Sequence, residues 1–190
     1  MKVDISPWTA LILALFIWVC GVNLLFAILL AALCHELGHY LLLRRLGAQM
    51  KTLRITLFGA EMEISNRRLS YGGEFLATAA GPAVNLLLAL FLSWLGRRWE
   101  GAYLYSGAQL VLGLFNLLPL FPLDGGRLLW LLIAWLREPY TADRFLSRFS
   151  CGFSVLLVLA GLALWLKEGS PFFFIGAIGL TGHNTVKKGL

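Results

Sequence analysis

The residues with the clearest chemical potential are His35, Glu36 and His39, which form an H-E-x-x-H motif. On a helix, two histidines four residues apart project from nearly the same face, one turn above the other. This spacing allows both imidazoles to bind one Zn²⁺ at about 2 Å each, with the intervening glutamate as general base. The motif lies in an apolar stretch from about residue 8 to 43, where charged groups are costly and usually functional. The pattern therefore suggests metal-assisted hydrolysis inside a membrane.

A catalytic zinc usually has a third protein ligand, and Asp124 is the acid available within the apolar stretch 102–136. Two prolines precede Asp124 and two glycines follow it, so the helix is expected to break there. A broken helix that carries one carboxylate is a suitable place for a metal. The alternative is that Asp124 pairs with Arg127, three residues further on.

Two other polar residues are candidates for the site. Asn116 lies one to two turns before the break, and its amide can either donate to a developing oxyanion or form an interhelical hydrogen bond. His183 could replace Asp124 as a ligand, but its place near the end of the last span favours an interfacial role. The small residues 79–83 and Asn85 predict tight helix packing, with Asn85 bonded to the site and no chemistry of its own.

The composition predicts an all-α polytopic membrane protein. Of the 190 residues, 59% are hydrophobic and only 14% are charged, and the mean hydropathy is +0.78. Because a span needs about 20 apolar residues, the chain has room for five or six spans and for no separate soluble domain. We therefore expect one transmembrane domain over residues 1–190.

Six transmembrane helices are predicted, with the fourth broken in the middle. Their approximate ranges are 6–20, 22–43, 74–95, 102–136, 149–166 and 171–184. Between the second and third, residues 51–66 alternate between apolar and polar side chains, with a turn at 58–60, which predicts a short interfacial β-hairpin. An edge strand of this hairpin could accept an extended peptide, or the hairpin could simply cover the bundle.

The basic residues predict the orientation in the membrane. The net charge is +6, and its placement beside apolar segments indicates membrane topology rather than nucleic-acid binding. With the N-terminus inside, twelve Lys and Arg residues are cytoplasmic and three are external. Both termini are then cytoplasmic. His35 lies about 20 Å along its helix from Val22, past the midplane towards the cytoplasm.

Three motifs together resemble a known family. Residues 35–39 on the second span, 80–85 on the third and 116–126 on the fourth look like those of the site-2 protease family, intramembrane zinc metalloproteases. The resemblance covers nearly the whole chain in order and spacing. It implies that His35, His39 and Asp124 bind one zinc ion, and that the zinc lowers the pKa of its water to about 7.

The resemblance also implies roles for the other site residues and for partners. Glu36 would act as general base, and Asn116 would bind substrate or stabilise the oxyanion. The expected substrate is a membrane-associated regulatory protein in a bacterial cell membrane, and inhibitory membrane proteins are expected partners. Family members that act in sporulation suggest a pro-sigma factor, but they carry a CBS domain that we do not expect here, and no PDZ domain is expected either. The alternative function is a metal-ion transporter that uses the same ligands.

Overall fold

The computed structural model describes residues 21–56, 59–65, 69–121 and 123–168 of the chain. By their contacts the residues divide into two units, 1–116 and 117–190. The predicted first and sixth spans lie outside the described residues, and so does His183. The prediction of one domain over the whole chain stays a prediction.

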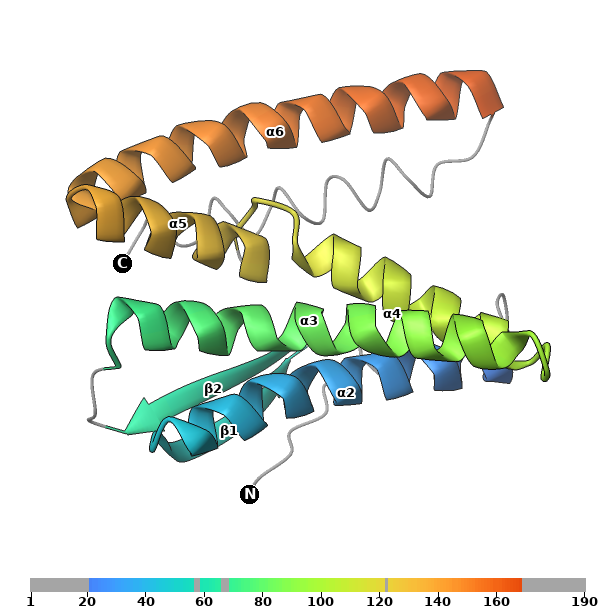
Figure 1. Ribbon diagram of the computed structural model, residues 1–190. Helices are drawn as coiled ribbons and strands as arrows, with labels where there is room; N and C mark the ends of the chain where they lie inside the picture. The colour runs from blue at the N-terminus through green and yellow to red at the C-terminus, as the bar shows by residue number, and fades with distance from the viewer. Residues whose placement is uncertain (1–20, 57–58, 66–68, 122, 169–190) are drawn as a thin grey trace. The chain divides into compact units, whose positions relative to one another are not determined.

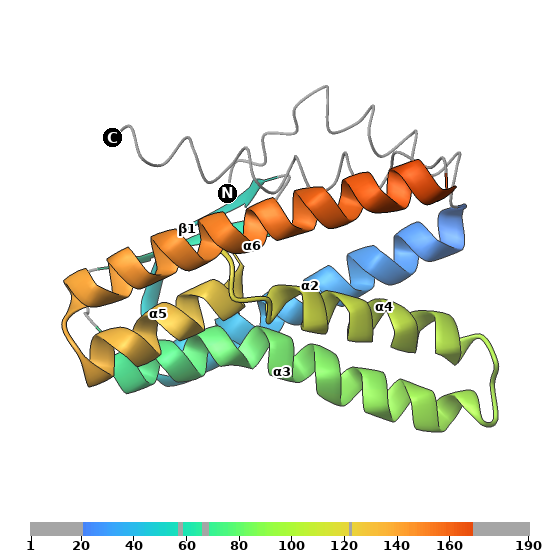
Figure 2. The same cartoon turned by 90° about the horizontal axis from the view of Figure 1, so that it is seen from above.

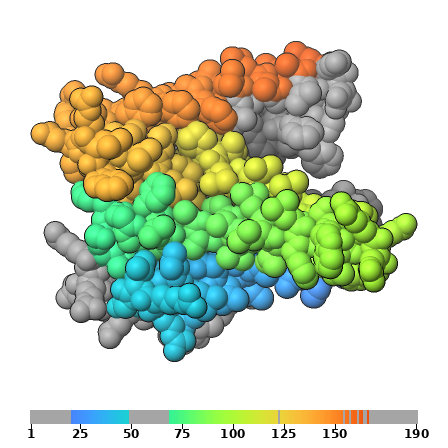
Figure 3. All heavy atoms as spheres, viewed as in Figure 1, coloured from blue at the N-terminus to red at the C-terminus, as the bar shows by residue number. Residues whose placement is uncertain are grey.

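Three helices form the first unit: α2 (Val22–Arg45), α3 (Tyr71–Gly96) and α4 (Ala102–Asn116). Each of them contacts the other two, and α2 runs beside α3 in both ribbon views (Figures 1 and 2). In the space-filling view α2 (blue) and α3 (green) lie in close contact (Figure 3). Among the described residues, α2 and α3 are the helices long and apolar enough to cross a membrane. The predicted second and third spans thus correspond to helices, while the total of six stays a prediction.

The interior of this unit is built from small and polar residues, and its exterior from large apolar ones. Buried positions include Ala27, Ala31, His35 and Gly38 on α2, Thr78, Gly81, Asn85 and Ala89 on α3, and Ala102, Ser106, Gln109 and Gly113 on α4. By contrast, Leu33, Leu87 and Val111 are each about two-thirds exposed. Small residues let helices approach closely in lipid, where the solvent is as apolar as leucine. The arrangement therefore fits a unit whose outer surface meets lipid.

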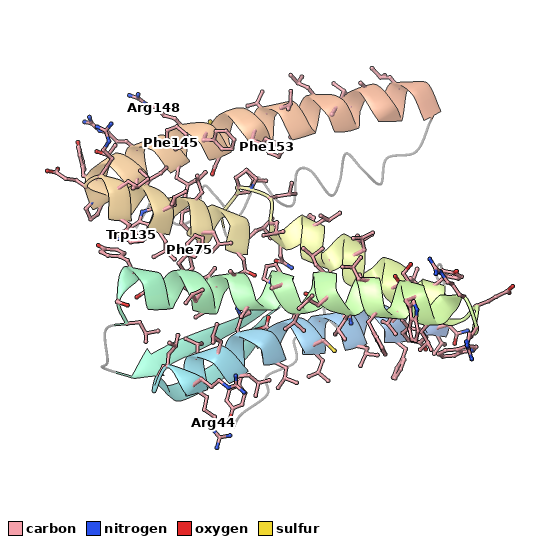
Figure 4. The ribbon with its side chains drawn as sticks, viewed as in Figure 1. Arg44, Phe75, Trp135, Phe145, Arg148 and Phe153 are labelled. Carbon is pink, nitrogen blue, oxygen red and sulfur yellow. The ribbon has the colours of Figure 1, made fainter. Side chains whose placement is uncertain are left out.

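A glycine turn ends α2 and ties it to the start of α3. Gly47 has a positive φ of 77°, a conformation that glycine adopts without steric cost. Its N–H donates to Arg44 O at 3.1 Å, and Ala48 N–H donates to Leu43 O at 3.0 Å. This pair of bonds is a Schellman motif. Leu43 and Ala48 then form a small buried cluster with Ala77 of α3, while the Arg44 side chain projects away from the unit (Figure 4).

An antiparallel hairpin connects α2 to α3. Its strands are β1 (Gln49–Thr56) and β2 (Gly59–Ser65), with an irregularity in the pairing between Met50 and Thr52. Gly59 and Ala60, which the sequence predicts in the turn, instead pair with Thr56 and Ile55. A two-residue connection suffices for an antiparallel hairpin, so the ladder extends further than the turn signal suggested.

Aromatic side chains gather where α3 ends and α4 begins. Trp99 and Tyr105 stack with ring centroids 6.3 Å apart, and Phe26 meets Tyr105 edge to face at 6.4 Å. Trp94 and Tyr103 are also about half exposed or more. Such aromatic groups are typical of the membrane–water interface. The basic last turn of α2, with Arg44 and Arg45, lies at the opposite end of that helix.

In the second unit, α5 (Asp124–Leu136) contacts α6 (Pro139–Glu168). The predicted break of the fourth span is present, since α4 ends at Asn116 and α5 begins at Asp124. Leu131 and Leu146 are each 1% exposed.

The helix α6 begins ten residues before the predicted fifth span. Its first turns are polar and include Arg144 and Arg148, and Arg148 points away from the helix (Figure 4). Hydropathy marks only the apolar part of such a helix. Pro139 suits the first helical position, because its missing N–H needs no partner there.

Candidate metal centre

His35 and His39 lie on one face of α2 and both contact α3. Their Nε2 atoms are 3.1 Å apart, and their rings meet edge to face with centroids 4.7 Å apart. His35 is 5% exposed, and His39 is half-buried. The two rings therefore present their Nε2 atoms to one shared point.

The other ring nitrogen of each histidine donates to a group on α3. His39 Nδ1 lies 2.8 Å from the backbone carbonyl oxygen of Ala77. His35 Nδ1 lies 2.5 Å from Oδ1 of Asn85, which is completely buried. Both oxygens only accept hydrogen bonds, so both Nδ1 atoms carry the proton. Each Nε2 is then left with a lone pair.

Two such nitrogens at 3.1 Å face each other lone pair to lone pair. This contact is repulsive unless a cation lies between them. Two imidazoles bound to one tetrahedral zinc at about 2.05 Å would hold their nitrogens about 3.3 Å apart. The observed separation is close to that value. Hydrogen bonds of this kind behind metal-bound histidines also set the tautomer and the ring orientation.

A glycine of α3 leaves room for the two imidazoles. A Cβ added at Gly81 would overlap Nε2 of His39 and lie 2.9 Å from Cε1 of His35. A Cβ added at Gly38, between the histidines on α2, would lie 2.8 Å from the carbonyl oxygen of Ala80. Both glycines therefore allow α2 and α3 to approach closely at the histidine pair.

Glu36 follows His35 on α2 and is half-buried. One residue along a helix turns the side chain by about 100°, so Glu36 leaves the helix beside the histidine face. This direction suits a base next to a metal better than a ligand of it.

Asp124 is the first residue of α5, in the second unit, and is half-buried. The turn before it packs tightly on the two glycines that follow. A Cβ at Gly125 would overlap the carbonyl oxygen of Leu117, and one at Gly126 would lie 2.5 Å from that of Leu120. The backbone of the turn thus positions Asp124, and glycine is required at both following positions.

His35 and His39 in the first unit and Asp124 in the second are side chains that could each offer one ligand atom to a metal ion. Two imidazoles and one carboxylate make the donor set of a catalytic zinc, with the fourth position left for water. Calcium and magnesium prefer oxygen ligands alone. The residues present therefore fit the predicted cofactor.

The Asn116 amide donates from Nδ2 to the carbonyl oxygen of Leu112, 3.1 Å away on its own helix. The sequence left two roles open for this amide, a contact with an oxyanion or an interhelical hydrogen bond. The observed bond lies within α4 and is neither of these. An amide nitrogen carries two protons, and the bond to Leu112 uses one of them.

One residue at the site has no counterpart in the sequence prediction. Gln109 of α4 is 2% exposed, and its Oε1 accepts a hydrogen bond from Asn85 Nδ2 at 2.5 Å. The sequence does contain a signal for Gln109, which is an uncharged amide within an apolar stretch. Buried polar groups in membrane helices usually form hydrogen bonds with other helices. Its partner is not adjacent in the sequence and could not be identified.

Comparison with known proteins places the chain in a family. Residues 23–109 and 99–160 match the profile of peptidase family M50. Rip3 of Mycobacterium tuberculosis is 32% identical over 161 residues, which are 80% of this chain and 41% of that protein. Stage IV sporulation protein FB of Bacillus subtilis is 31% identical over 186 residues, 92% of this chain and 64% of that protein. The chain thus spans from about two fifths to less than two thirds of these relatives' length.

A solved structure shares the fold. The site-2 protease from Methanocaldococcus jannaschii matches with a TM-score of 0.65 over 90% of this chain and 84% of that chain, at 23% identity. Several relatives carry zinc metalloprotease in their names, in agreement with the zinc cofactor predicted for this chain. The alternative of a metal-ion transporter finds no support among these relatives. The predicted resemblance is confirmed, and the chain is a membrane protein that belongs to peptidase family M50.

Proposed function

We propose that this protein is an intramembrane zinc endopeptidase, which hydrolyses a peptide bond in or near the membrane segment of a membrane-associated protein. The observation that carries the proposal is the histidine pair. Both Nδ1 atoms donate to acceptors on α3, and the two Nε2 atoms lie 3.1 Å apart. The pair lies on an apolar helix, with Glu36 beside it.

In this proposal His35, His39 and Asp124 are the zinc ligands. When bound, zinc lowers the pKa of a water and polarises the scissile carbonyl. The histidines contribute nitrogens whose lone pairs are oriented before the metal arrives, so little rearrangement is needed on binding. Asp124 contributes the carboxylate from the start of α5, where an anionic group also suits the helix N-terminus.

Glu36 is proposed as the general base. Its carboxylate takes a proton from the attacking water while the water oxygen bonds to the carbonyl carbon. It then gives that proton to the amide nitrogen as the carbon–nitrogen bond breaks. The products are a carboxylic acid terminus and an amine, which together contain the atoms of the peptide and of one water molecule.

Asn116 is proposed to hold the carbonyl oxygen of the substrate. Its Nδ2 keeps one proton on Leu112 O and directs the second to the substrate. Donors of this kind stabilise the negative charge that develops on the oxygen, typically by about 3 kcal/mol.

We infer that the chain is a multi-pass protein of a bacterial cell membrane, with both termini cytoplasmic and one catalytic domain. The distribution of Lys and Arg supports this orientation. The aromatic groups near Trp94 and Trp99 suit the outer interface, where α2 starts. His35 lies about 20 Å along α2 from that end, so water would reach it from the cytoplasmic side.

The proposed substrate is a membrane-associated regulatory protein. A helix hides its peptide carbonyls in internal hydrogen bonds, so the segment must be extended before it is cut. An edge of the β1–β2 hairpin could hold it by strand addition. One relative is a sporulation protein by name, which supports testing a pro-sigma factor first.

The test is cleavage of co-expressed, membrane-associated sigma-factor precursors, combined with zinc content of the purified protein. Glu36→Gln should keep zinc and lose cleavage, because it changes the base and no ligand. Glu100→Gln, which alters a carboxylate in the loop between α3 and α4, is the matched control and should cleave normally. Processing by Glu36→Gln at the wild-type rate would refute the mechanism.

A further inference from the structure

A chain of buried hydrogen bonds crosses the first unit from α4 to α2. Asn85 Nδ2 donates to Gln109 Oε1 at 2.5 Å, and His35 Nδ1 donates to Asn85 Oδ1 at 2.5 Å. The exposed fractions are 2% for Gln109, 0% for Asn85 and 5% for His35. Three helices thus contribute one residue each to a single polar path through the interior of the unit.

One backbone carbonyl fixes the direction of the whole path. Asn85 Nδ2 also donates to the carbonyl oxygen of Ala31, 3.1 Å away, and a backbone carbonyl can only accept. The nitrogen of the Asn85 amide must therefore face Ala31. Gln109 must then present its oxygen to that nitrogen, and Asn85 must present its own oxygen to His35. The orientation of each amide follows from these contacts.

We propose that Gln109 is a positioning residue for zinc binding, which acts through Asn85 to keep the proton of His35 on Nδ1. The inference rests on the proposed function in one respect, namely that His35 binds zinc through Nε2. Without the Gln109 oxygen, one Asn85 proton loses its acceptor in a site closed to water. The amide is then held on that side by the Ala31 oxygen alone, and its Oδ1 is less firmly fixed on His35 Nδ1. The proton of His35 can then move to Nε2, where it blocks the metal.

The packing of α4 supports this role. One turn after Gln109, a Cβ added at Gly113 would lie 3.0 Å from the Asn85 Cβ, so glycine lets α4 approach Asn85. One turn before Gln109, Ser106 Oγ donates to Ala89 O at 2.8 Å. Ser106 therefore also makes a buried polar contact between α4 and α3. Its hydrogen bond to Ala89 is not connected to His35.

The first measurement is the zinc dissociation constant by competition with a chelator. Gln109→Met keeps the shape and removes the acceptor, and it should weaken zinc binding about tenfold, as for groups that support metal ligands. Gln109→Glu keeps an acceptor oxygen and should stay within about twofold of wild type. Ser106→Ala is the matched control and should not change the affinity.

A double-mutant cycle tests whether Gln109 acts through Asn85. Asn85→Asp accepts from His35 Nδ1 whether or not Gln109 is present, so adding Gln109→Met should then have little effect. A tenfold loss that persists in the Asn85→Asp background would overturn the proposed path. If Gln109→Met does not fold, Gly113→Ala provides a second test, since it only separates α4 from Asn85. It should weaken zinc binding about threefold, and unchanged affinity would count against the inference.

The second measurement is the tautomer of His35 in zinc-free protein, from the ¹⁵N shifts of labelled histidines. The chain has three histidines, so His39→Asn and His183→Asn suffice for assignment. Wild type should have the proton on Nδ1, and Gln109→Met should show a mixture. If wild-type protein binds no zinc, the proposed function fails, yet the tautomer still tests the path. An unchanged tautomer in Gln109→Met would overturn the inference whether or not zinc binds.

Discussion

The two units hold their proposed metal ligands by different means. In the first unit, hydrogen bonds that His35 and His39 donate to acceptors on α3 orient the two imidazoles. In the second, a turn of backbone packed on Gly125 and Gly126 positions Asp124. The histidines therefore depend on partners distant in sequence, whereas Asp124 depends on its immediate neighbours. Substitutions should affect the two regions in different ways.

The largest effect is expected from Gly81→Ala, which removes the room for the histidine pair. The added methyl group would overlap His39 Nε2 and crowd His35. Purified protein should retain about a tenth of an equivalent of zinc or less, and cleavage should be undetectable. Zinc content by mass spectrometry gives the answer. Gly72→Ala, on the same helix with nothing within 4 Å of the new methyl group, should bind zinc normally.

The next effect concerns the turn before α5. Gly125→Ala would bring a methyl group against the carbonyl oxygen of Leu117, and backbone cannot yield as a flexible side chain can. We expect Asp124 to shift, and cleavage to fall about hundredfold, as for an ångström-scale displacement of a catalytic group. Gly152→Ala of α6, where the added methyl group meets nothing, is the control within the second unit. Equal cleavage by both variants would show that the turn does not position Asp124.

The support of the two histidines can be separated by Asn85→Leu. The substitution removes the acceptor of His35 and leaves that of His39, which is the Ala77 backbone. Zinc affinity should fall about 10- to 100-fold, while the His39 tautomer stays unchanged in ¹⁵N spectra. A change in the His39 tautomer of this variant would show that the two supports are not independent.

The difference between the regions also explains what the sequence could predict. Asp124 can be predicted as a ligand because its signal is local, with prolines before it and glycines after it. The approximate ranges of α2 and α3 followed from hydropathy, and the His35–His39 face followed from helix periodicity. By contrast, the bond from Gln109 to Asn85 depends on which faces of α3 and α4 meet. Hydropathy does not distinguish those faces, because lipid-facing and buried positions are both uncharged.

The smallest effect should come from an exposed polar contact between α5 and α6. Trp130 Nε1 donates to Asp143 Oδ1 at 2.7 Å on the surface of the second unit. Trp130→Phe keeps most of the ring and loses this exposed bond, so the free energy of unfolding should fall by about 0.5 kcal/mol. Zinc affinity and cleavage should not change. Unfolding in a detergent titration measures this free energy. A loss of zinc binding would mean that surface contacts of α5 and α6 also position Asp124.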